Sequence, residues 1–399
     1  MLKDIIGLLL LLTAINGFAQ QTIDGDKGEP DESIDAVSSS SSSEFTDDAE
    51  LAKVNQPQAP LTLLDTVVPP ATAQRLSWQP NQSLDGLSQP TPVLVVNGAQ
   101  TGPVLCLTAA VHGDELNGIE IVRRILHGID PEQLSGAIIG VPIVNLQGFQ
   151  RASRYLSDRR DLNRFFPGNS HGSSASRMAH SFFHEIISHC QYVVDIHTGS
   201  AHRTNLPQVR ANLHDINVEK FARAFGIPVI LHSKGTEGML RYAAVEANIP
   251  AVTLEMGESM TLQETAVRHG VKGIKMLLSK MKMLNNSLSG SDPESIYYQS
   301  AWVRADQGGI LLSNVGLGDR VNKNKVLGVI TDPITNMRSE IISPYDGQVI
   351  GMAFDQIVMP GFAGFHIGLQ KTEEKLSGIE NKSNNSLAAS QSVSESESE

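Results

Sequence analysis

The stretch VLCLTAAVHGDELNGIEIVRRIL, from Val104 to Leu126, decides the fold class of this chain. Its first part, Val104–Val111, is a continuous apolar run that is typical of a buried strand. The part that follows has apolar residues at helical spacing, namely Leu116, Ile119, Val122, Ile125 and Leu126. A buried strand that leads into such a helix is the repeating unit of an α/β sheet. His112 and Glu115 lie at the junction, where the ligands of such sheets gather.

The same alternation runs through the middle of the chain. Apolar runs predict further strands at 92–96, 137–144, 192–196, 229–232 and 251–255. Helical patterns predict helices at 174–190, 218–225 and 261–284. The alternation predicts an α/β fold, with a mostly parallel mixed sheet covered by helices on both faces.

A second motif, VVDIHTG, places His197 at the end of another predicted strand. Two neutral imidazoles and one carboxylate suit Zn²⁺ and leave a fourth coordination position open. We therefore predict one zinc ion per chain, bound by His112, Glu115 and His197. The alternative for the His-x-x-Glu pair is an exposed polar turn. Asp195 favours the metal, because a metal-bound histidine commonly donates its other N–H to an acceptor.

Two further groups of residues suggest chemistry beside the metal. Asp161, Asn163 and Arg164, with Arg154 upstream, suggest anion recognition, because a guanidinium binds a carboxylate through two parallel hydrogen bonds. The alternative is a solvated basic loop. Glu255 ends the apolar run 249–254, and a carboxylate at a strand end can take a proton from water. Glu258 is a nearby competitor for this role.

The chain contains, in this order, the motifs AAVHGDELNGIE, DLNRFFPG, DIHTG and TLEMGE. Together they resemble the succinylglutamate desuccinylase/aspartoacylase family, which is related to the zinc carboxypeptidases. The resemblance covers about residues 93–278. It implies a zinc carboxypeptidase-like fold. It also implies that His112, Glu115 and His197 are the zinc ligands and that Glu255 is the general base and proton shuttle.

The resemblance assigns roles to four more residues. Asn163 and Arg164 match the pair that holds the free carboxylate of the substrate. Arg154 matches the arginine that polarises the scissile carbonyl, although its spacing to Asn163 is stretched by a couple of residues. Asp161 matches the position that hydrogen-bonds the first zinc histidine.

The composition changes at both ends of this region. Residues 1–19 are typical of a signal peptide, with an apolar core too short for stable membrane insertion, which predicts an exported, periplasmic or secreted protein. The alternative is an uncleaved N-terminal anchor. Residues 20–58 and 372–399 are acidic and rich in serine, so we predict a disordered linker and tail.

The remaining chain divides into a predicted catalytic domain, 59–290, and a C-terminal β module, 295–371. Short β-like runs between turn residues in the module resemble the barrel-sandwich repeats of biotinyl and lipoyl domains. The hairpin at 332–338 has no lysine to modify, which favours a structural or access-restricting cap over a swinging arm. The alternative is an unrelated β-sandwich.

The charge and the cysteine content argue against nucleic-acid binding and against cysteine-based zinc or redox motifs. The net charge of −12 belongs to the acidic tails, so the body is near neutral and no nucleic-acid partner is predicted. Cys106 and Cys190 lack the spacing of zinc or redox motifs. Whether they form a disulfide stays open at this point.

The pattern predicts a zinc-dependent amidohydrolase that cleaves an N-acyl amino acid, a small-molecule substrate carrying a carboxylate. A metallocarboxypeptidase acting on short or cell-wall peptides would use the same site. A non-catalytic periplasmic binding protein is the alternative from another class. The acyl group, the amino acid and the oligomeric state are not determined by the sequence.

Overall fold

The computed structural model describes residues 56–80, 89–200, 202–285, 293, 295–354 and 356–369. The predicted signal peptide, nearly all of the predicted linker 20–58 and the predicted tail 372–399 lie outside the described residues. Among the residues that are described, no helix has the length and apolarity that a membrane span requires.

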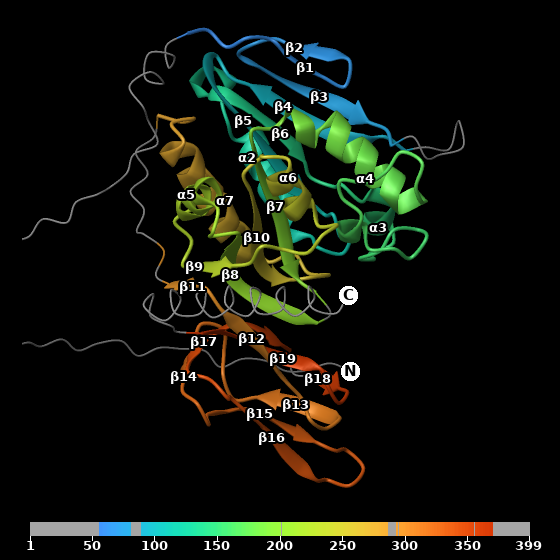
Figure 1. Ribbon diagram of the computed structural model, residues 1–399, viewed down its shortest axis with the longest axis vertical. Helices are drawn as coiled ribbons and strands as arrows, with labels where there is room; N and C mark the ends of the chain where they lie inside the picture. Colours follow the sequence, from blue (N-terminus) through green and yellow to red (C-terminus); the bar gives the residue numbers. More distant parts are fainter. Residues whose placement is uncertain are drawn as a thin grey trace, which may run out of the picture. The chain divides into compact units, whose positions relative to one another are not determined.

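The described chain is a succession of strands and helices (Figure 1). The helices are α2 (Asn117–His127), α3 (Leu146–Gln150), α4 (Ser174–Glu185), α5 (Ile216–Arg223), α6 (Leu240–Glu246) and α7 (Glu264–Lys280), with 3-10 turns η1 (Pro131–Gln133), η2 (Leu162–Arg164) and η3 (Ile187–His189). The strands up to α7 are β1 (Leu61–Leu63), β2 (Thr66–Val68), β3 (Thr72–Trp78), β4 (Thr91–Asn97), β5 (Gln100–Ala109), β6 (Ser135–Val141), β7 (Tyr192–Gly199), β8 (Arg203–Ala211), β9 (Val229–His232) and β10 (Ala251–Glu258). The strands after α7 are β11 (Ser295–Tyr297), β12 (Ser300–Arg304), β13 (Gly309–Ser313), β14 (Arg320–Val321), β15 (Val326–Thr331), β16 (Arg338–Ile342), β17 (Gly347–Ala353), β18 (Gln356–Val358) and β19 (Ala363–Leu369).

One large mixed sheet organises the molecule. Its main path runs β12-β19-β17-β8-β10-β7-β5-β6-β4-β3. The central neighbours β10, β7, β5 and β6 are parallel, and β8 is antiparallel to β10. Parallel strands bring their carboxyl ends to one edge, so the segments that follow β5 and β7 meet there. The predicted mixed, mostly parallel α/β sheet is confirmed.

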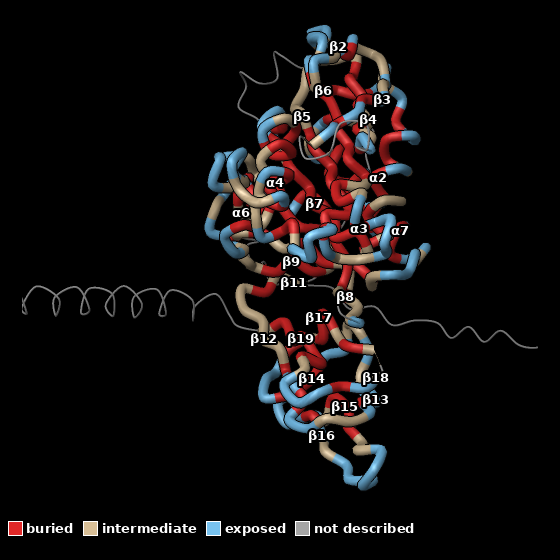
Figure 2. Tube along the Cα trace, turned by 90° about the vertical axis from the view of Figure 1, so that its right-hand side faces the viewer, coloured by how far each residue is buried: buried red, intermediate tan, exposed pale blue. Residues whose placement is uncertain are grey.

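Helices cover both faces of this sheet because successive side chains of a strand point to opposite sides. Leu105 and Leu107 of β5 pack in one apolar cluster with residues of α2, α5 and α7. Cys106, between them, packs in a second cluster with residues of α4 and α6. Figure 2 shows the buried residues running through the central strands.

The C-terminal region is β-rich, and it continues the large sheet. Strand β17 pairs with β8, so β12, β17 and β19 extend the same sheet that carries β7 and β10. The other strands of this region include a four-stranded sheet in the order β16-β15-β13-β18. The hairpin expected near 332–338 is the turn between β15 and β16. Strand pairing is therefore continuous between the helical part and the C-terminal region.

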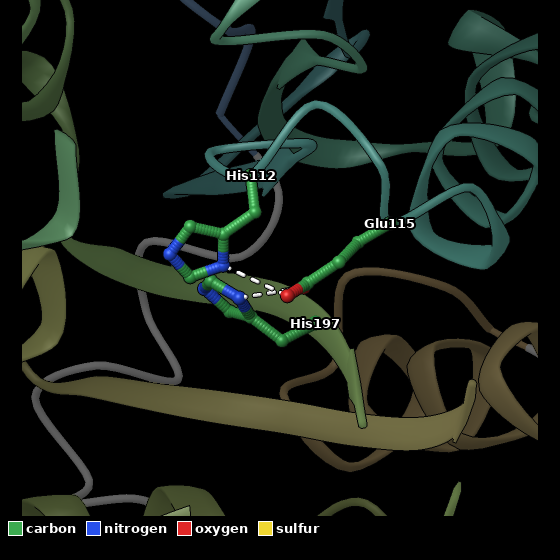
Figure 3. A group of neighbouring side chains, drawn as sticks. All are labelled: His112, Glu115 and His197. Carbon is green, nitrogen blue, oxygen red and sulfur yellow. Dashed lines mark hydrogen bonds and ion pairs between the residues drawn. The ribbon is translucent and has the colours of Figure 1, made fainter. Parts of the chain in front are cut away.

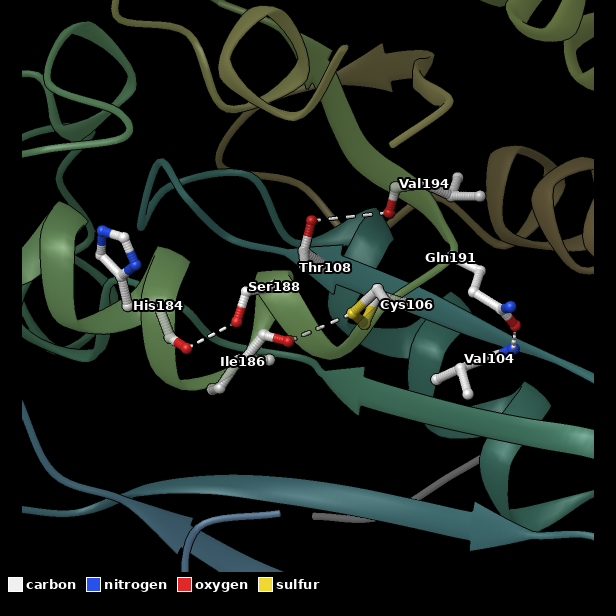
Figure 4. Close-up of a disulfide and its surroundings, with 9 residues drawn as sticks. Val104, Cys106, Thr108, His184, Ile186, Ser188, Gln191 and Val194 are labelled. Carbon is white, nitrogen blue, oxygen red and sulfur yellow. Dashed lines mark hydrogen bonds between the residues drawn. A yellow bond between two sulfur atoms is a disulfide. The ribbon is translucent and has the colours of Figure 1, made fainter. Parts of the chain in front are cut away.

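A disulfide joins Cys106 to Cys190, with their Cα atoms 5.8 Å apart (Figure 4). Cys106 lies on β5, and Cys190 immediately precedes β7. The bond therefore links the two strands that lead to His112 and to His197. The two cysteines, whose state could not be predicted from the sequence, are thus paired with each other.

Replacing both cysteines by alanine is expected to lower the free energy of unfolding by about 2–5 kcal/mol, because the cross-link restricts the unfolded chain. Denaturant unfolding of the double variant, compared with oxidised and reduced wild type, measures the effect. Reduced wild type should resemble the variant. Equal stability of all three samples would show that the bond contributes nothing.

Candidate active site

The loop after β5 aims two side chains at one point. Strand β5 ends at Ala109, and Ala110 adopts φ +47°, a left-handed conformation that turns the chain sharply. Gly113 follows in close contact with α3, where an added Cβ would lie 2.1 Å from the backbone of Gly148 and Phe149. Only glycine fits there, and its absence of a side chain lets the loop bring His112 and Glu115 together.

His112, Glu115 and His197 converge in the structure (Figure 3). The Nδ1 atom of His112 lies 2.8 Å from Glu115 Oε1, and Nδ1 of His197 lies 2.9 Å from Glu115 Oε2. All three side chains are buried, and one potential ligand atom from each lies within 4.8 Å of the others. The backbone N–H of Thr198 donates to Glu115 Oε2 at 3.0 Å and helps to orient the carboxylate.

Two carboxylates hold the outer side of the histidines. Asp161 lies 3.0 Å from Nε2 of His112, and Asp195 lies 2.7 Å from Nε2 of His197. An ionised carboxylate only accepts hydrogen bonds, so each Nε2 carries the proton that it donates. The lone pairs of neutral rings are then at Nδ1, and both face the carboxylate of Glu115.

The electrostatics of this cluster favour a cation. Burial opposes ionisation of Glu115, but His112 and His197 outweigh it and hold the pKa of Glu115 well below its usual range. Burial likewise disfavours a charged His197, but Asp195 and Glu115 outweigh it and raise the pKa of His197 well above its usual value. A field that holds a proton this strongly also favours a metal ion at the same point.

The donor set fits a divalent metal. Two Nδ1 lone pairs and one carboxylate point at a common position, and such groups at hydrogen-bonding distance require a proton or a cation between them. Imidazole and carboxylate donors in this number leave a coordination position open. The three residues therefore form a site that can hold a metal ion.

The cluster forms part of a cavity of about 400 Å³. The lining includes every residue that the sequence proposed for direct metal or substrate contact: His112, Glu115, Arg154, Asn163, Arg164, His197 and Glu255. Asp161 and Asp195 lie behind the histidines. Glu258, the competitor of Glu255, is not among the described residues that line the cavity.

Arg154 lies directly beside the candidate metal ligands despite its stretched spacing. Its Nη1 is 3.1 Å from His112 Nδ1 and 3.4 Å from Glu115 Oε1, and its Nη2 is 2.9 Å from Asp161 Oδ2. Burial disfavours its charge, but the carboxylates of Asp161 and Glu115 raise its pKa overall. The guanidinium therefore stays charged at the edge of the metal position.

Asn163 and Arg164 come from the 3-10 turn η2. Oδ1 of Asn163 accepts the backbone N–H of Leu240 at 2.8 Å, which fixes the amide so that the donor Nδ2 remains for a ligand. Arg164 donates from Nη1 to the carbonyl of Asn163 at 2.8 Å. The pair thus presents donors to the cavity, as recognition of an anion requires.

Strand β8 supplies cavity residues that sequence reasoning missed. Arg203, Asn205 and Arg210 all line the cavity from this strand. Its sequence, RTNLPQVRA, contains a proline and no apolar run, so the periodicity that revealed the other strands is absent. The two arginines and the asparagine of this strand were the local signal for a polar site.

Basic side chains dominate the cavity. The lining includes two carboxylates, those of Glu115 and Glu255. It also includes more basic side chains, namely Arg154, Arg164, Arg203, Arg210, Lys234 and Arg241. Arg241 is 4% exposed, and burial, followed by the nearby Arg210, lowers its pKa to about 10. It remains charged at neutral pH, and the hydrogen bonds that it forms with described residues go to neutral groups of Thr253 and Ser233. The cavity is therefore suited to an anionic ligand.

The C-terminal region also contributes to the wall. Trp302 of β12 lines the cavity and stacks on His366 of β19, with ring centroids 4.5 Å apart. The guanidinium of Arg203 lies 5.1 Å from the ring centroid of Trp302 and 4.5 Å from that of Phe362. Arg203 also donates from Nε to the carbonyl of Ala363 at 2.8 Å. Trp302 thus places a side chain of the C-terminal region on the cavity wall.

Two curated proteins are similar to this chain in sequence. The N-alpha-acetyl-L-2,4-diaminobutyric acid deacetylase of Halomonas elongata is 26% identical over 253 residues, which are 60% of this chain and 74% of that protein. The succinylglutamate desuccinylase of Ectopseudomonas mendocina is 29% identical over 171 residues, which are 39% of this chain and 50% of that protein. Both relatives are named for the removal of an acyl group.

Solved structures share the fold. A product-bound ectoine utilization protein from Ruegeria pomeroyi superimposes with a TM-score of 0.69 at 22% identity, covering 79% of this chain and 99% of that one. A succinylglutamate desuccinylase/aspartoacylase from Rhodobacter sphaeroides gives a TM-score of 0.67 at 24% identity, covering 75% of this chain and 96% of that one. Residues 101–281 match the model of the succinylglutamate desuccinylase/aspartoacylase catalytic domain. This match identifies residues 101–281 as a catalytic domain of the succinylglutamate desuccinylase/aspartoacylase family.

Proposed function

We propose that this protein is a zinc-dependent amidohydrolase that removes the acyl group from an N-acyl amino acid. The observation that carries the proposal is the convergence of His112, Glu115 and His197 in a cavity that also contains Glu255 and the donors of Asn163 and Arg164. The acyl-removing activities for which the two relatives are named support the same class of reaction.

Each protein residue has a distinct task in this reaction. Zinc, when bound by His112, Glu115 and His197, supplies a Lewis acid and lowers the pKa of water. Glu255 takes a proton from the attacking water and later delivers it to the leaving amine nitrogen. Arg154, beside the metal ligands, donates hydrogen bonds to the oxygen on which negative charge develops.

Recognition of the substrate rests on its carboxylate. Nδ2 of Asn163 and the guanidinium of Arg164 can donate to it together, which sets the position of the amide bond. The excess of basic side chains around the cavity supports an anionic substrate. A volume of about 400 Å³ suits a small ligand, which favours an acylated amino acid over a longer peptide.

A substrate panel tests the proposal. The purified protein, loaded with zinc or stripped of metal, is assayed for release of free amine from N-acetyl and N-succinyl amino acids and from dipeptides. Metal-dependent turnover of an acyl amino acid supports the deacylase. Preference for dipeptides would identify a carboxypeptidase, and the absence of turnover of any compound would favour a binding protein.

Arg164→Ala is expected to reduce kcat/KM for a carboxylate-bearing substrate about tenfold to hundredfold, or about 1.5–3 kcal/mol, mainly through KM. The amide or ester of the same substrate should be affected much less. Arg164→Lys should recover little, because a point charge does not reproduce the planar fork. If wild type processes the amide as well as the acid, the substrate class lacks the carboxylate and Arg164 belongs to the loop structure.

We also propose that the protein is exported. The signal-peptide pattern of residues 1–19 motivates this, and the disulfide between Cys106 and Cys190 supports it, because disulfides persist mainly in oxidising compartments. Fractionation of the producing cells with an antibody to this protein tests it. Recovery of the reduced, full-length chain from the cytoplasm would contradict it.

A further inference from the structure

Strand β8 holds both oxygens of the Glu255 carboxylate. Nη1 of Arg210 lies 3.2 Å from Oε1 of Glu255, and Nδ2 of Asn205 donates to Oε2. Because β8 is antiparallel to β10, Arg210 pairs in register with Thr253 and Asn205 with Gly257, on either side of Glu255. A register shift between Glu255 and Gly257 brings Asn205 within reach of the carboxylate. The two contacts therefore reach Glu255 from both directions along its own strand.

These contacts restrict a torsion that is otherwise soft. The terminal torsion of a glutamate side chain is broad, so a free carboxylate samples many orientations. Here each oxygen has one fixed donor, and the side chain of Glu255 is 13% exposed. Each carboxylate oxygen has further acceptor capacity, so a lone pair remains available on the cavity side.

Glu255 is the only carboxylate that Arg210 contacts in the described part of the chain. His366, 4% exposed and near Arg210, does not compete as a second charge, since burial, followed by the charge of Arg210, lowers the pKa of His366 to about 3. Nε of Arg210 is itself buried and has no partner among the described atoms. The ion pair with Glu255 is thus the main polar contact of this guanidinium.

We infer that Arg210 and Asn205 are positioning residues, which hold the carboxylate of Glu255 in the orientation needed for proton transfer. The inference rests on the proposed role of Glu255 as the base. Proton transfer depends on distance and direction, and a misplacement of about 1 Å can cost about a hundredfold in rate.

A strand of the C-terminal region lies beside Asn205 and limits the space for its side chain. Gly351 of β17 is in register with Asn205, and an added Cβ at Gly351 would lie 2.7 Å from Asn205 Oδ1. A methyl group there would push the Asn205 amide aside. The amide can move without a shift of the backbone because it lies at the end of the side chain. Gly351→Ala therefore disturbs the Asn205 contact without altering any residue that touches Glu255.

Kinetics of Arg210→Met, Arg210→Lys and Gly351→Ala test the inference with an acyl amino acid that wild type hydrolyses. We expect Arg210→Met to lower kcat about tenfold to hundredfold with KM within about threefold, since the base is misplaced but the substrate site is kept. Arg210→Lys should restore part of the loss, and Gly351→Ala should lower kcat less. Arg223→Met is the control, because Arg223 forms a similar ion pair with Glu219 on α5, at 2.7 Å.

A double-variant cycle separates positioning from general damage. In a Glu255→Gln background, Arg210→Met should have little further effect, because its target is gone. A rise in KM with unchanged kcat would make Arg210 a substrate ligand, and an undiminished effect without Glu255 would make it a residue of general structure. Either outcome overturns the inference while leaving the proposed function intact. Full activity of Glu255→Gln would instead remove the proposed base.

Crystal structures of wild type and Arg210→Met give a readout that needs no substrate. The carboxylate of Glu255 should leave its wild-type position or become disordered in the variant. If it keeps the wild-type orientation in Arg210→Met, and also in a structure of Gly351→Ala, Arg210 and Asn205 do not position it.

Discussion

Glu255→Gln is expected to lower turnover by about 10²- to 10⁴-fold, because the change removes the proton-accepting group and nearly keeps the shape of the side chain. Metal content and substrate affinity should stay close to those of wild type. Asn205 and Arg210 will still surround the side chain, so the cavity should remain intact. Steady-state kinetics, metal analysis and substrate titration of the variant measure the three quantities.

Glu258→Gln is the matched control for this experiment. Glu258 lies on the same strand, three residues further on, and is not among the described residues that line the cavity. It should retain activity within about twofold of wild type, as surface changes away from a site do. If Glu258→Gln is inactive and Glu255→Gln is active, the base has been assigned to the wrong carboxylate.

His112→Ala is expected to lose both the metal and the activity. The variant removes one of three ligands and leaves Asp161 and Glu115 without the imidazole that lies between them. Wild type should hold about one zinc ion per chain, and chelators should remove it with loss of turnover. Metal analysis by mass spectrometry, together with activity before and after chelation, measures this.

His184→Ala is the matched control for the metal experiment. His184 is exposed on α4 and lies against His180 with tilted rings whose centroids are 4.2 Å apart, and it is not among the described residues that line the cavity. Its loss should change neither bound zinc nor turnover. Equal zinc content in wild type and in His112→Ala would refute the ligand assignment, even if both proteins were active.

Local sequence patterns were sufficient to predict the central sheet and the candidate metal ligands. Strands such as β5 and β7 are buried on both faces, so their apolar runs are continuous and easily recognised. The ends of parallel strands meet at one edge, so His112 and His197 could be placed together although 85 positions separate them in the sequence. The local pattern was sufficient because burial and ligand position both follow from strand geometry.

The surroundings of the candidate metal ligands could not be predicted from local sequence patterns. Strand β8 is polar because it faces the cavity, so its sequence contains no apolar run that predicts a strand. Its cavity residues Arg203, Asn205 and Arg210 were therefore not predicted. Trp302 reaches the same cavity from the C-terminal strands, which join the large sheet through β17. Contacts between segments so distant in the chain depend on sheet order and register, which local periodicity does not encode.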